Sequence, residues 1–96
     1  MKVYLKVHVK EDIETIACCD EELLNQVFKE GNLRIEISNS FFGGKLLHLK
    51  EAIMILKNAS YFNIVGEKII EKAIENELIQ HYKTICGIPM AIKMMF

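Results

Sequence analysis

Cysteine, long apolar runs and leader-like segments are scarce or missing in this sequence. The three cysteines, Cys18, Cys19 and Cys86, are too few for the disulfide framework of a small secreted domain or for a four-cysteine zinc site. No apolar run approaches the roughly 18 residues that a membrane-spanning helix needs. The first residues enter a strand pattern directly, without the order of a secretory signal. We therefore expect a cytoplasmic protein with reduced thiols and no membrane contact.

Positive charge is also limited. Twelve basic and thirteen acidic residues give a net charge of -1, so no global field attracts nucleic acid or anionic lipid. Arg34 is the one arginine in the sequence. Because arginine is the preferred fork for phosphates and guanine edges, its scarcity weakens a nucleic-acid interpretation more than the net charge does. RNA binding would depend on lysine.

The composition is that of a globular protein. Hydrophobic residues make up 51% of the chain and charged residues 26%, which excludes disorder. Ninety-six residues fit one domain and leave no room for a second core, and neither a repeat nor a linker divides them. We expect a single domain over residues 1–96, with modest stability or stability gained by association.

The N-terminal segment predicts a β-hairpin. Residues 3–10 alternate strictly, with apolar side chains on one face and polar or aromatic ones on the other. Glu11 and Asp12 supply a turn, and residues 13–19 form a second strand.

Three helices are expected after this hairpin. Asp20 stands where an N-cap belongs and Gly31 where a helix ends, which predicts a first helix between them. An apolar stripe over residues 49–59 predicts a second helix, and Asn63 can cap a third.

Further strands are expected at residues 33–37, at 84–86 and, after a turn at 87–89, at 90–95. Short strands interleaved with a few helices do not fit a doubly wound sheet. The sequence predicts an α+β fold: a two-layer α/β sandwich with a mixed sheet of about five short strands and about three helices.

Several segments together resemble a known family. They are residues 19–24 (CDEELL), 41–44 (FFGG), 63–67 (NIVGE) and 87–89 (GIP), after a lysine-rich opening strand. In these segments, over nearly its full length and in the same order, the chain resembles the archaeal family known as domain of unknown function 424. The resemblance implies a stand-alone cytoplasmic archaeal protein of two-layer α/β architecture, with no established activity. The chain departs from the family at Cys86, where the closing turn usually has the first of two glycines.

Asn63, Gly66 and Glu67 are the leading ligand-binding candidates. If Asn63 caps a helix, Gly66 lets a ligand approach free N–H groups at the helix N-terminus, where anions are favoured. Glu67 would then act as a base or ligand. The alternative is an ordinary cap, with Gly66 relieving helix packing.

Gly43 and Gly44 are a second candidate. A glycine pair can cradle phosphate, but neither the GxGxxG spacing nor a Gly-Lys-Ser/Thr ending is present. A tight turn is the alternative.

The polar face of the first strand is a candidate nucleic-acid surface. Its side chains are Tyr4, Lys6, His8 and Lys10. An aromatic and basic row of this kind can follow an RNA backbone or stack on a base. A solvated sheet face is the alternative.

No catalytic or metal-binding pattern is present. The cysteines and histidines lack ligand spacing on one element, and no serine lies in a nucleophile elbow. We expect no metal and no cofactor.

The sequence therefore favours a binding or interaction module over an enzyme. Met54 and Ile55 widen the apolar stripe of the second expected helix, and Met94, Met95 and Phe96 end the chain with apolar residues. These features predict a protein partner or self-association, with a ribonucleoprotein or translation-associated partner as one candidate. The alternative is an enzyme or ligand-binding protein that uses the helix start at Asn63, Gly66 and Glu67 for an anionic ligand.

Overall fold

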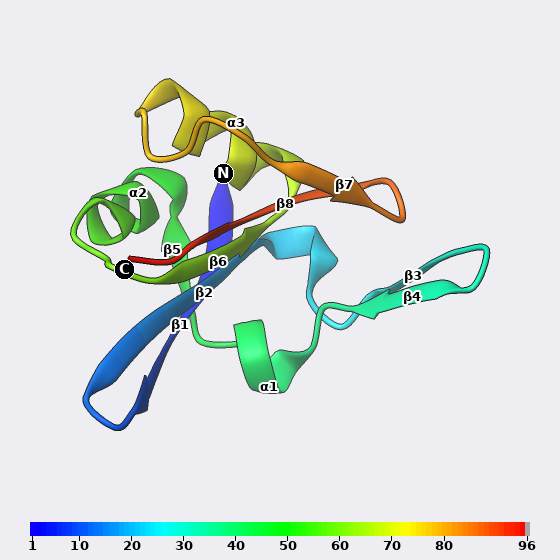
Figure 1. The fold of residues 1–96 in the computed structure, drawn as a ribbon, viewed down its shortest axis with the longest axis horizontal. Coiled ribbons are helices and arrows are strands. Elements are labelled where there is room, and N and C mark those ends of the chain that lie inside the picture. The colour runs from blue at the N-terminus through cyan, green and yellow to red at the C-terminus, as the bar shows by residue number, and fades with distance from the viewer. Residues whose placement is uncertain (96) are drawn as a thin grey trace.

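The computed structural model describes residues 1–95, which form a mixed sheet with helices on it (Figure 1). The strands are β1 (Lys2–Lys10), β2 (Ile13–Asp20), β3 (Val27–Glu30), β4 (Leu33–Glu36), β5 (Lys45–His48), β6 (Phe62–Val65), β7 (Lys83–Ile85) and β8 (Ile88–Lys93). The helices are α1 (Asn39–Phe42), α2 (Leu49–Lys57) and α3 (Glu67–Glu75), with a 3-10 turn η1 (Glu21–Leu23). Six strands form one sheet in the order β5-β1-β2-β6-β8-β7, and β3 and β4 form a separate hairpin.

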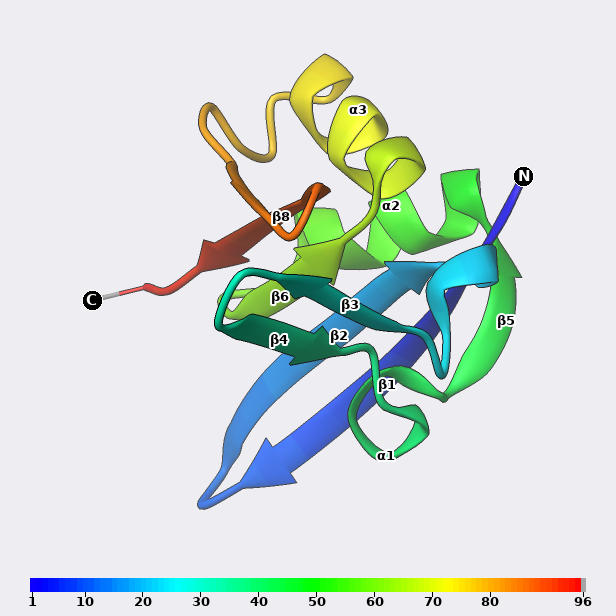
Figure 2. The ribbon, with the colours of Figure 1, turned by 90° about the vertical axis from the view of Figure 1, so that its right-hand side faces the viewer.

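The N-terminal hairpin is confirmed. β1 and β2 pair antiparallel, and the turn between them uses Glu11 and Asp12 at φ of 51° and 66°. Only the base of this hairpin lies in the core. Val7 and Val9 are 46% and 68% exposed, because the outer half of β1 and β2 extends beyond the body of the molecule (Figures 1 and 2).

The helix predicted between Asp20 and Gly31 is wrong. The chain forms η1, passes Asn25 at a φ of 68°, and then enters β3. β3 pairs with β4 through a two-residue turn in which Gly31 has a φ of +59°. Gly31 therefore turns a hairpin here and does not end a helix. Asp20 cannot act as a local cap because its carboxylate is bound elsewhere.

The connection between β4 and α2 contains a short helix and a strand that the sequence did not reveal. The Oγ of Ser38 accepts a hydrogen bond from the N–H of Phe41 and caps α1. β5 then pairs with the first half of β1. α2 follows over the expected stripe, and Met54 on its outer side is 67% exposed.

The third helix begins later than predicted. Asn63 lies inside β6, which pairs in parallel with β2, so it does not cap a helix. α3 begins at Glu67, and Gly66 is its N-cap residue. The segment Phe62–Val65 is rich in strand-forming residues and is buried on both faces of the sheet.

The closing hairpin turns one residue earlier than expected. Cys86 and Gly87 form the turn at φ of 53° and 79°, and Pro89 lies inside β8. A positive φ is a conformation that glycine adopts readily, so Cys86 occupies a turn position that favours glycine.

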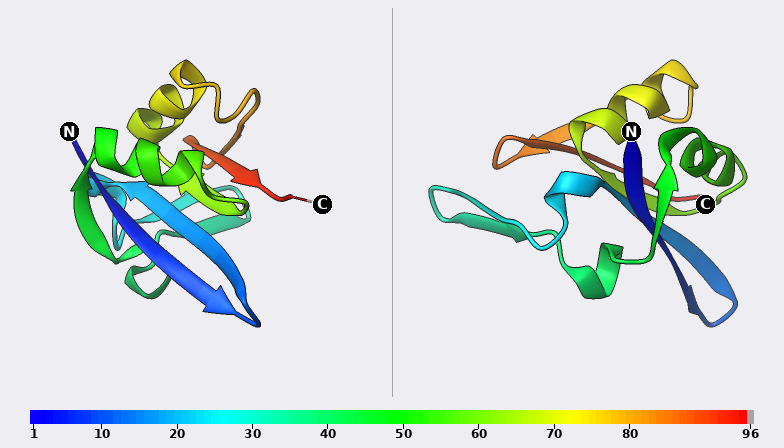
Figure 3. Two further views of the ribbon diagram at one scale, coloured as in Figure 1. Left: turned by 90° about the vertical axis from the view of Figure 1, so that its left-hand side faces the viewer. Right: turned by 180° about the vertical axis from the view of Figure 1, so that it is seen from behind.

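Two hydrophobic clusters lie on the two faces of the sheet. α2 and α3 cover one face, and α1, η1 and the β3–β4 hairpin cover part of the other (Figures 1 and 3). The first cluster contains Val3, Leu5, Ile16, Cys18, Leu56, Phe62, Ile64 and Ile69, and the second contains Ala17, Cys19, Ile37, Phe42 and Val65. The α+β class is confirmed. The strand count exceeds the expected five because β3, β5 and β6 were not predicted.

The thiols of the central strand are buried. Burial raises the pKa of Cys19 to about 12, and the neighbouring Asp20 charge adds to this effect. Burial also raises the pKa of Cys18. Because the thiolate is the reactive form, both side chains act as core residues. In residues 1–95, every helix is too short or too polar to cross a membrane.

Candidate functional site

The start of α3 is held by a carboxylate from the sheet. Asp20 ends β2 and is buried. Its Oδ2 accepts a hydrogen bond from the N–H of Lys68 and its Oδ1 accepts one from the N–H of Ile69, each at 2.9 Å. These two N–H groups have no partner inside the helix, and the helix dipole favours a negative charge beside them. Asp20 thus supplies, from 48 residues away, the capping carboxylate that the N-cap residue Gly66 lacks.

Gly66 makes this approach possible. Its φ of +126° lies in a region that L side chains rarely adopt, and a Cβ built on it would lie 2.3 Å from Cγ of Asp20. Its N–H donates to the carbonyl oxygen of Pro89, and its own carbonyl accepts from Ile70. The carbonyl of Gly66 thus accepts its hydrogen bond within α3 and needs no N–H donor from β8. Proline, which has no N–H, is therefore tolerated at position 89.

The electrostatics of Asp20 reflect two opposing effects. Burial raises the pKa of this carboxyl above its ordinary value, while the N–H groups of Lys68 and Ile69 act in the opposite direction. Beside it, the Nζ of Lys68 lies 3.0 Å from Oε1 of Glu22, and both side chains are partly exposed.

The three predicted anion-binding residues do not form one site. Asn63 pairs in the sheet with Ala17 and Ile92 on the face opposite α3, where it borders a hollow lined partly by Phe42. Gly66 and Glu67 stay together at the start of α3. The N–H groups beyond them are already bound by Asp20. Binding of an external anion there stays a prediction.

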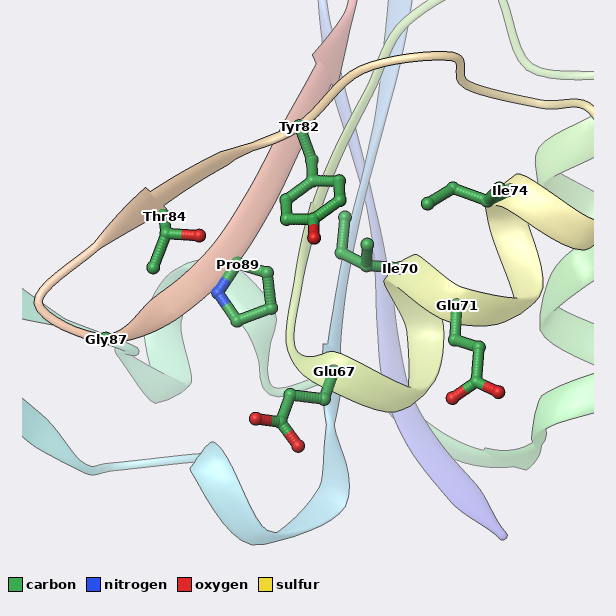
Figure 4. Close-up of a pocket in the computed structure, with 8 residues that line it drawn as sticks. All are labelled: Glu67, Ile70, Glu71, Ile74, Tyr82, Thr84, Gly87 and Pro89. Atoms are coloured by element: carbon green, nitrogen blue, oxygen red, sulfur yellow. The ribbon is translucent and has the colours of Figure 1, made fainter.

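A groove lies between α3 and the β7–β8 hairpin, with a volume of about 540 Å³. Figure 4 shows the side chains that line it: Glu67, Ile70, Glu71 and Ile74 from the helix, and Tyr82, Thr84, Gly87 and Pro89 from the hairpin region. The ring of Tyr82 points toward Ile70 across the groove. Glu67, a ligand-binding candidate from the sequence, therefore lies at one end of an open groove.

The groove combines an apolar floor with negative charge. Glu67 and Glu71 are four residues apart, which places both on one side of α3. Both are exposed, and within residues 1–95 neither carboxylate is in an ion pair. Ile74 is 42% exposed, and Pro89 is buried in the floor. Such a surface can bind a basic side chain whose apolar stem lies on the floor.

Gly43 and Gly44 lie elsewhere, in the connection between α1 and β5. A Cβ on Gly43 would meet Oδ1 of Asn39 at 2.0 Å, and one on Gly44 would meet the carbonyl oxygen of Leu5 at 2.0 Å. Both glycines therefore permit close packing of the backbone. They are not among the residues that line the groove.

The polar row of β1 holds α1 against the sheet. The Nζ of Lys6 donates to the carbonyl oxygen of Ser40 at 2.8 Å, and Nε2 of His8 donates to that of Phe41 at 2.7 Å. The His8 and Phe41 rings also stack, with centroids 4.8 Å apart.

Tyr4 packs against the same side of the sheet, and Lys10 is exposed at the hairpin tip. A nucleic-acid role for the row Tyr4 to Lys10 stays a prediction, although two of its four side chains already have partners within the chain.

Sequence reasoning missed Asp20, Tyr82 and Thr84 as site residues. Asp20 is followed by two glutamates, a pattern typical of a local helix start, and nothing in the sequence signals its distant partner. Tyr82 and Thr84 line the groove only because the β7–β8 hairpin packs beside α3. Among residues 1–95, no group of three or more histidine, cysteine, aspartate or glutamate side chains is placed to hold a metal ion.

Comparison with solved structures supports the fold. A crystal structure of an uncharacterized conserved protein from Methanopyrus kandleri is similar, with a TM-score of 0.79 and 22% sequence identity. The match covers 96% of this chain and 90% of that one. No curated protein matches the chain. The model of the family described as "Protein of unknown function (DUF424)" matches residues 7–86, and the chain therefore belongs to this family.

Proposed function

We propose that the protein is a non-enzymatic binding module whose groove between α3 and β7 holds a basic, partly apolar segment of a partner protein. One observation carries this proposal: the apolar floor at Ile70, Ile74 and Pro89 lies beside the carboxylates of Glu67 and Glu71, which form no ion pair with residues 1–95. A lysine or arginine complements that surface in both charge and polarity, because its apolar stem can lie on the floor while its charged head meets the carboxylates.

Other apolar side chains also support an interaction role. Several remain exposed outside the groove: Val7, Val9, Ile13, Ile92, Met94 and Met95. Phe96, the last member of the apolar C-terminus, lies outside the described residues. On the sequence features alone, we also propose that the protein is archaeal and cytoplasmic and that it can self-associate.

A protein partner fits the groove better than RNA does. The carboxylates of Glu67 and Glu71 repel phosphate, and Lys6 and His8 on the far side of the sheet are bound to α1. RNA contact through Lys10, within a ribonucleoprotein or translation-associated assembly, would leave the groove free for a protein of that assembly. An anionic ligand at α3 ranks behind, because it would have to displace Asp20.

The proposal is tested by site-specific photo-cross-linking in cells. A photoreactive benzoylphenylalanine replaces Ile74 in the groove or, as a matched control, Met54 on α2, which is more exposed. We expect a discrete protein adduct from position 74. Glu71→Lys on the same chain should reduce its yield by about tenfold or more, since like charges across an interface cost several kcal/mol. Glu14→Lys, at an exposed position on the β1–β2 hairpin, should leave the yield unchanged.

Two results would contradict the groove as the binding surface. One is an adduct from position 54 with none from position 74. The other is an adduct from position 74 that Glu71→Lys and Glu14→Lys reduce equally, because binding would then follow net charge alone.

A further inference from the structure

The edge strand β7 has a hollow on each of its two faces. Among residues 1–95, β7 ends the six-stranded sheet and pairs with β8 alone. The α3 groove lies on one face. On the other is a second hollow of about 560 Å³, lined by His81, Tyr82, Lys83, Ile85, Met90, Ala91 and Ile92. Tyr82 borders both hollows and is 50% exposed.

The backbone of Thr84 faces the open side of β7. Opposite residues in an antiparallel pair alternate between exchanging two hydrogen bonds and exchanging none. Thr84 lies opposite Pro89, which has no N–H and cannot take part in such an exchange. The Thr84 pair is therefore the non-bonded kind, and its N–H and C=O point away from β8. An extended chain beside β7 would meet both groups.

We propose that the partner's segment binds by adding to β7 as an antiparallel strand, with basic side chains over the α3 groove and apolar side chains over the second hollow. This inference rests on the proposed function and names its binding mode. Side chains of a strand alternate between faces, so one extended segment supplies both hollows. In strand addition, main-chain hydrogen bonds give affinity and pockets for alternate side chains give specificity.

Charge decides between a foreign segment and a second copy of this chain. In a symmetric antiparallel pair of two β7 strands, each copy would present Thr84 and Tyr82 to the other's α3 groove. Neither residue carries positive charge to match Glu67 and Glu71. Lys83 is on the opposite face, beside the second hollow. The occupant is therefore a partner segment with lysine or arginine at alternate positions.

The proposed pairing also fixes which backbone groups of the partner bind. A residue directly opposite Thr84 has its side chain on the same face as Thr84, toward α3. That residue is one of the basic ones. Only the N–H and C=O groups of the basic residues then face β7, whereas those of the apolar residues point away. This distinction gives a test on the ligand that leaves the protein unchanged.

The probe is a seven-residue peptide that alternates lysine and valine, starts and ends with lysine, and is acetylated and amidated at its ends. Two isomers carry two N-methyl groups each, one on the inner lysines and the other on two of the valines. Binding to the full 96-residue chain is followed by amide chemical shifts. We expect the parent peptide to shift Thr84 and Ile74. Methylation of the lysines should weaken binding by about tenfold or more, as expected when hydrogen bonds are lost. Methylation of the valines should change it by less than about twofold, because those N–H groups make no bond.

A pair of protein variants gives the complementary result. Thr84→Pro removes the outward N–H at an edge position where proline is compatible with a strand, and Thr84→Val keeps it. Thr84→Pro should abolish peptide binding and Thr84→Val should preserve it. Circular dichroism is used to check that both variants fold. If Thr84→Pro does not fold, the comparison of the two methylated peptides still tests strand addition.

Three outcomes would overturn strand addition. Equal weakening by the two methylated isomers would show that side chains alone bind. If the parent peptide caused no chemical-shift change, a segment of alternating basic and apolar residues would not be the ligand of β7. A dimer that sedimentation detects and Thr84→Pro dissociates would assign the β7 edge to a second copy. A charge-dependent adduct at position 74 would stand in the first two cases, so failure of this inference is separable from failure of the proposed function.

Discussion

Replacing Gly66 with alanine should lower the free energy of unfolding by about 3 kcal/mol or more, because the change combines backbone strain with a collision. The φ of +126° disfavours any L side chain, and the new methyl group would lie 2.3 Å from Cγ of Asp20. Asp20 cannot move away without losing its hydrogen bonds to Lys68 and Ile69. For a domain of this size the loss corresponds to a fall in Tm of about 15 °C, which thermal denaturation followed by circular dichroism measures.

Gly31→Ala is the matched control for this prediction. Gly31 also has a positive φ, at +59°, but a Cβ there meets nothing within 4 Å. The control should cost about 1 kcal/mol, from backbone conformation alone. A double variant with Asp20→Ala removes the colliding side chain, so Gly66→Ala should be less damaging in that background. Equal losses for Gly66→Ala and Gly31→Ala would contradict the close approach of Asp20.

Asp20→Ala should destabilise the fold by about 2 to 3 kcal/mol at neutral pH, because two N–H groups at a buried helix start lose their acceptor. Lys68 and Ile69 carry those groups. Urea denaturation gives the free energy of unfolding directly. Glu21→Ala, next along the chain at an exposed position, should change it by less than about 0.5 kcal/mol. Comparable losses for both variants would refute the assignment of Asp20 as the cap of α3.

The pH dependence of Asp20 has a defined sign. Burial raises its pKa in the folded state, so from about pH 4 upward the folded protein retains a proton that the unfolded chain releases. The contribution of this carboxyl to stability is therefore complete below its unfolded pKa and decreases as the pH rises through the folded pKa. The stability difference between the native protein and Asp20→Asn should be larger at pH 4 than at pH 7. A difference that grows with pH would show that the two N–H donors outweigh burial.

Local patterns in the sequence predicted part of this fold. The alternation along β1 and the turn at Glu11 and Asp12 specify a hairpin, and the apolar stripes of α2 and α3 specify helices. The prediction of a helix after Asp20 was wrong because the capping and apolar residues of this segment also suit a turn followed by a strand. Val27 and Phe28 favour a strand, and pairing with β4 decides between the two.

The candidate site was predictable only at one end. Glu67 and Gly66 were identified from the sequence, and they lie together at the start of α3. Asn63 was assigned to the same site because four residues of strand were not distinguished from a helix start. The groove itself depends on the packing of β7 beside α3, which no local pattern specifies. The partner of Asp20 is likewise set by the pairing of β2 with β6.

We propose that the protein binds its partner through the α3–β7 groove, while Asp20 closes the start of α3. A single set of amide chemical-shift titrations of the 96-residue chain tests both parts, with inorganic phosphate and the lysine–valine peptide as the two probes. We expect the peptide to shift Thr84 and Ile74, and phosphate to leave Lys68 and Ile69 unmoved. Phosphate shifts at Lys68 and Ile69, with no response of Thr84 or Ile74 to the peptide, would contradict binding through the groove and favour an anion-binding protein.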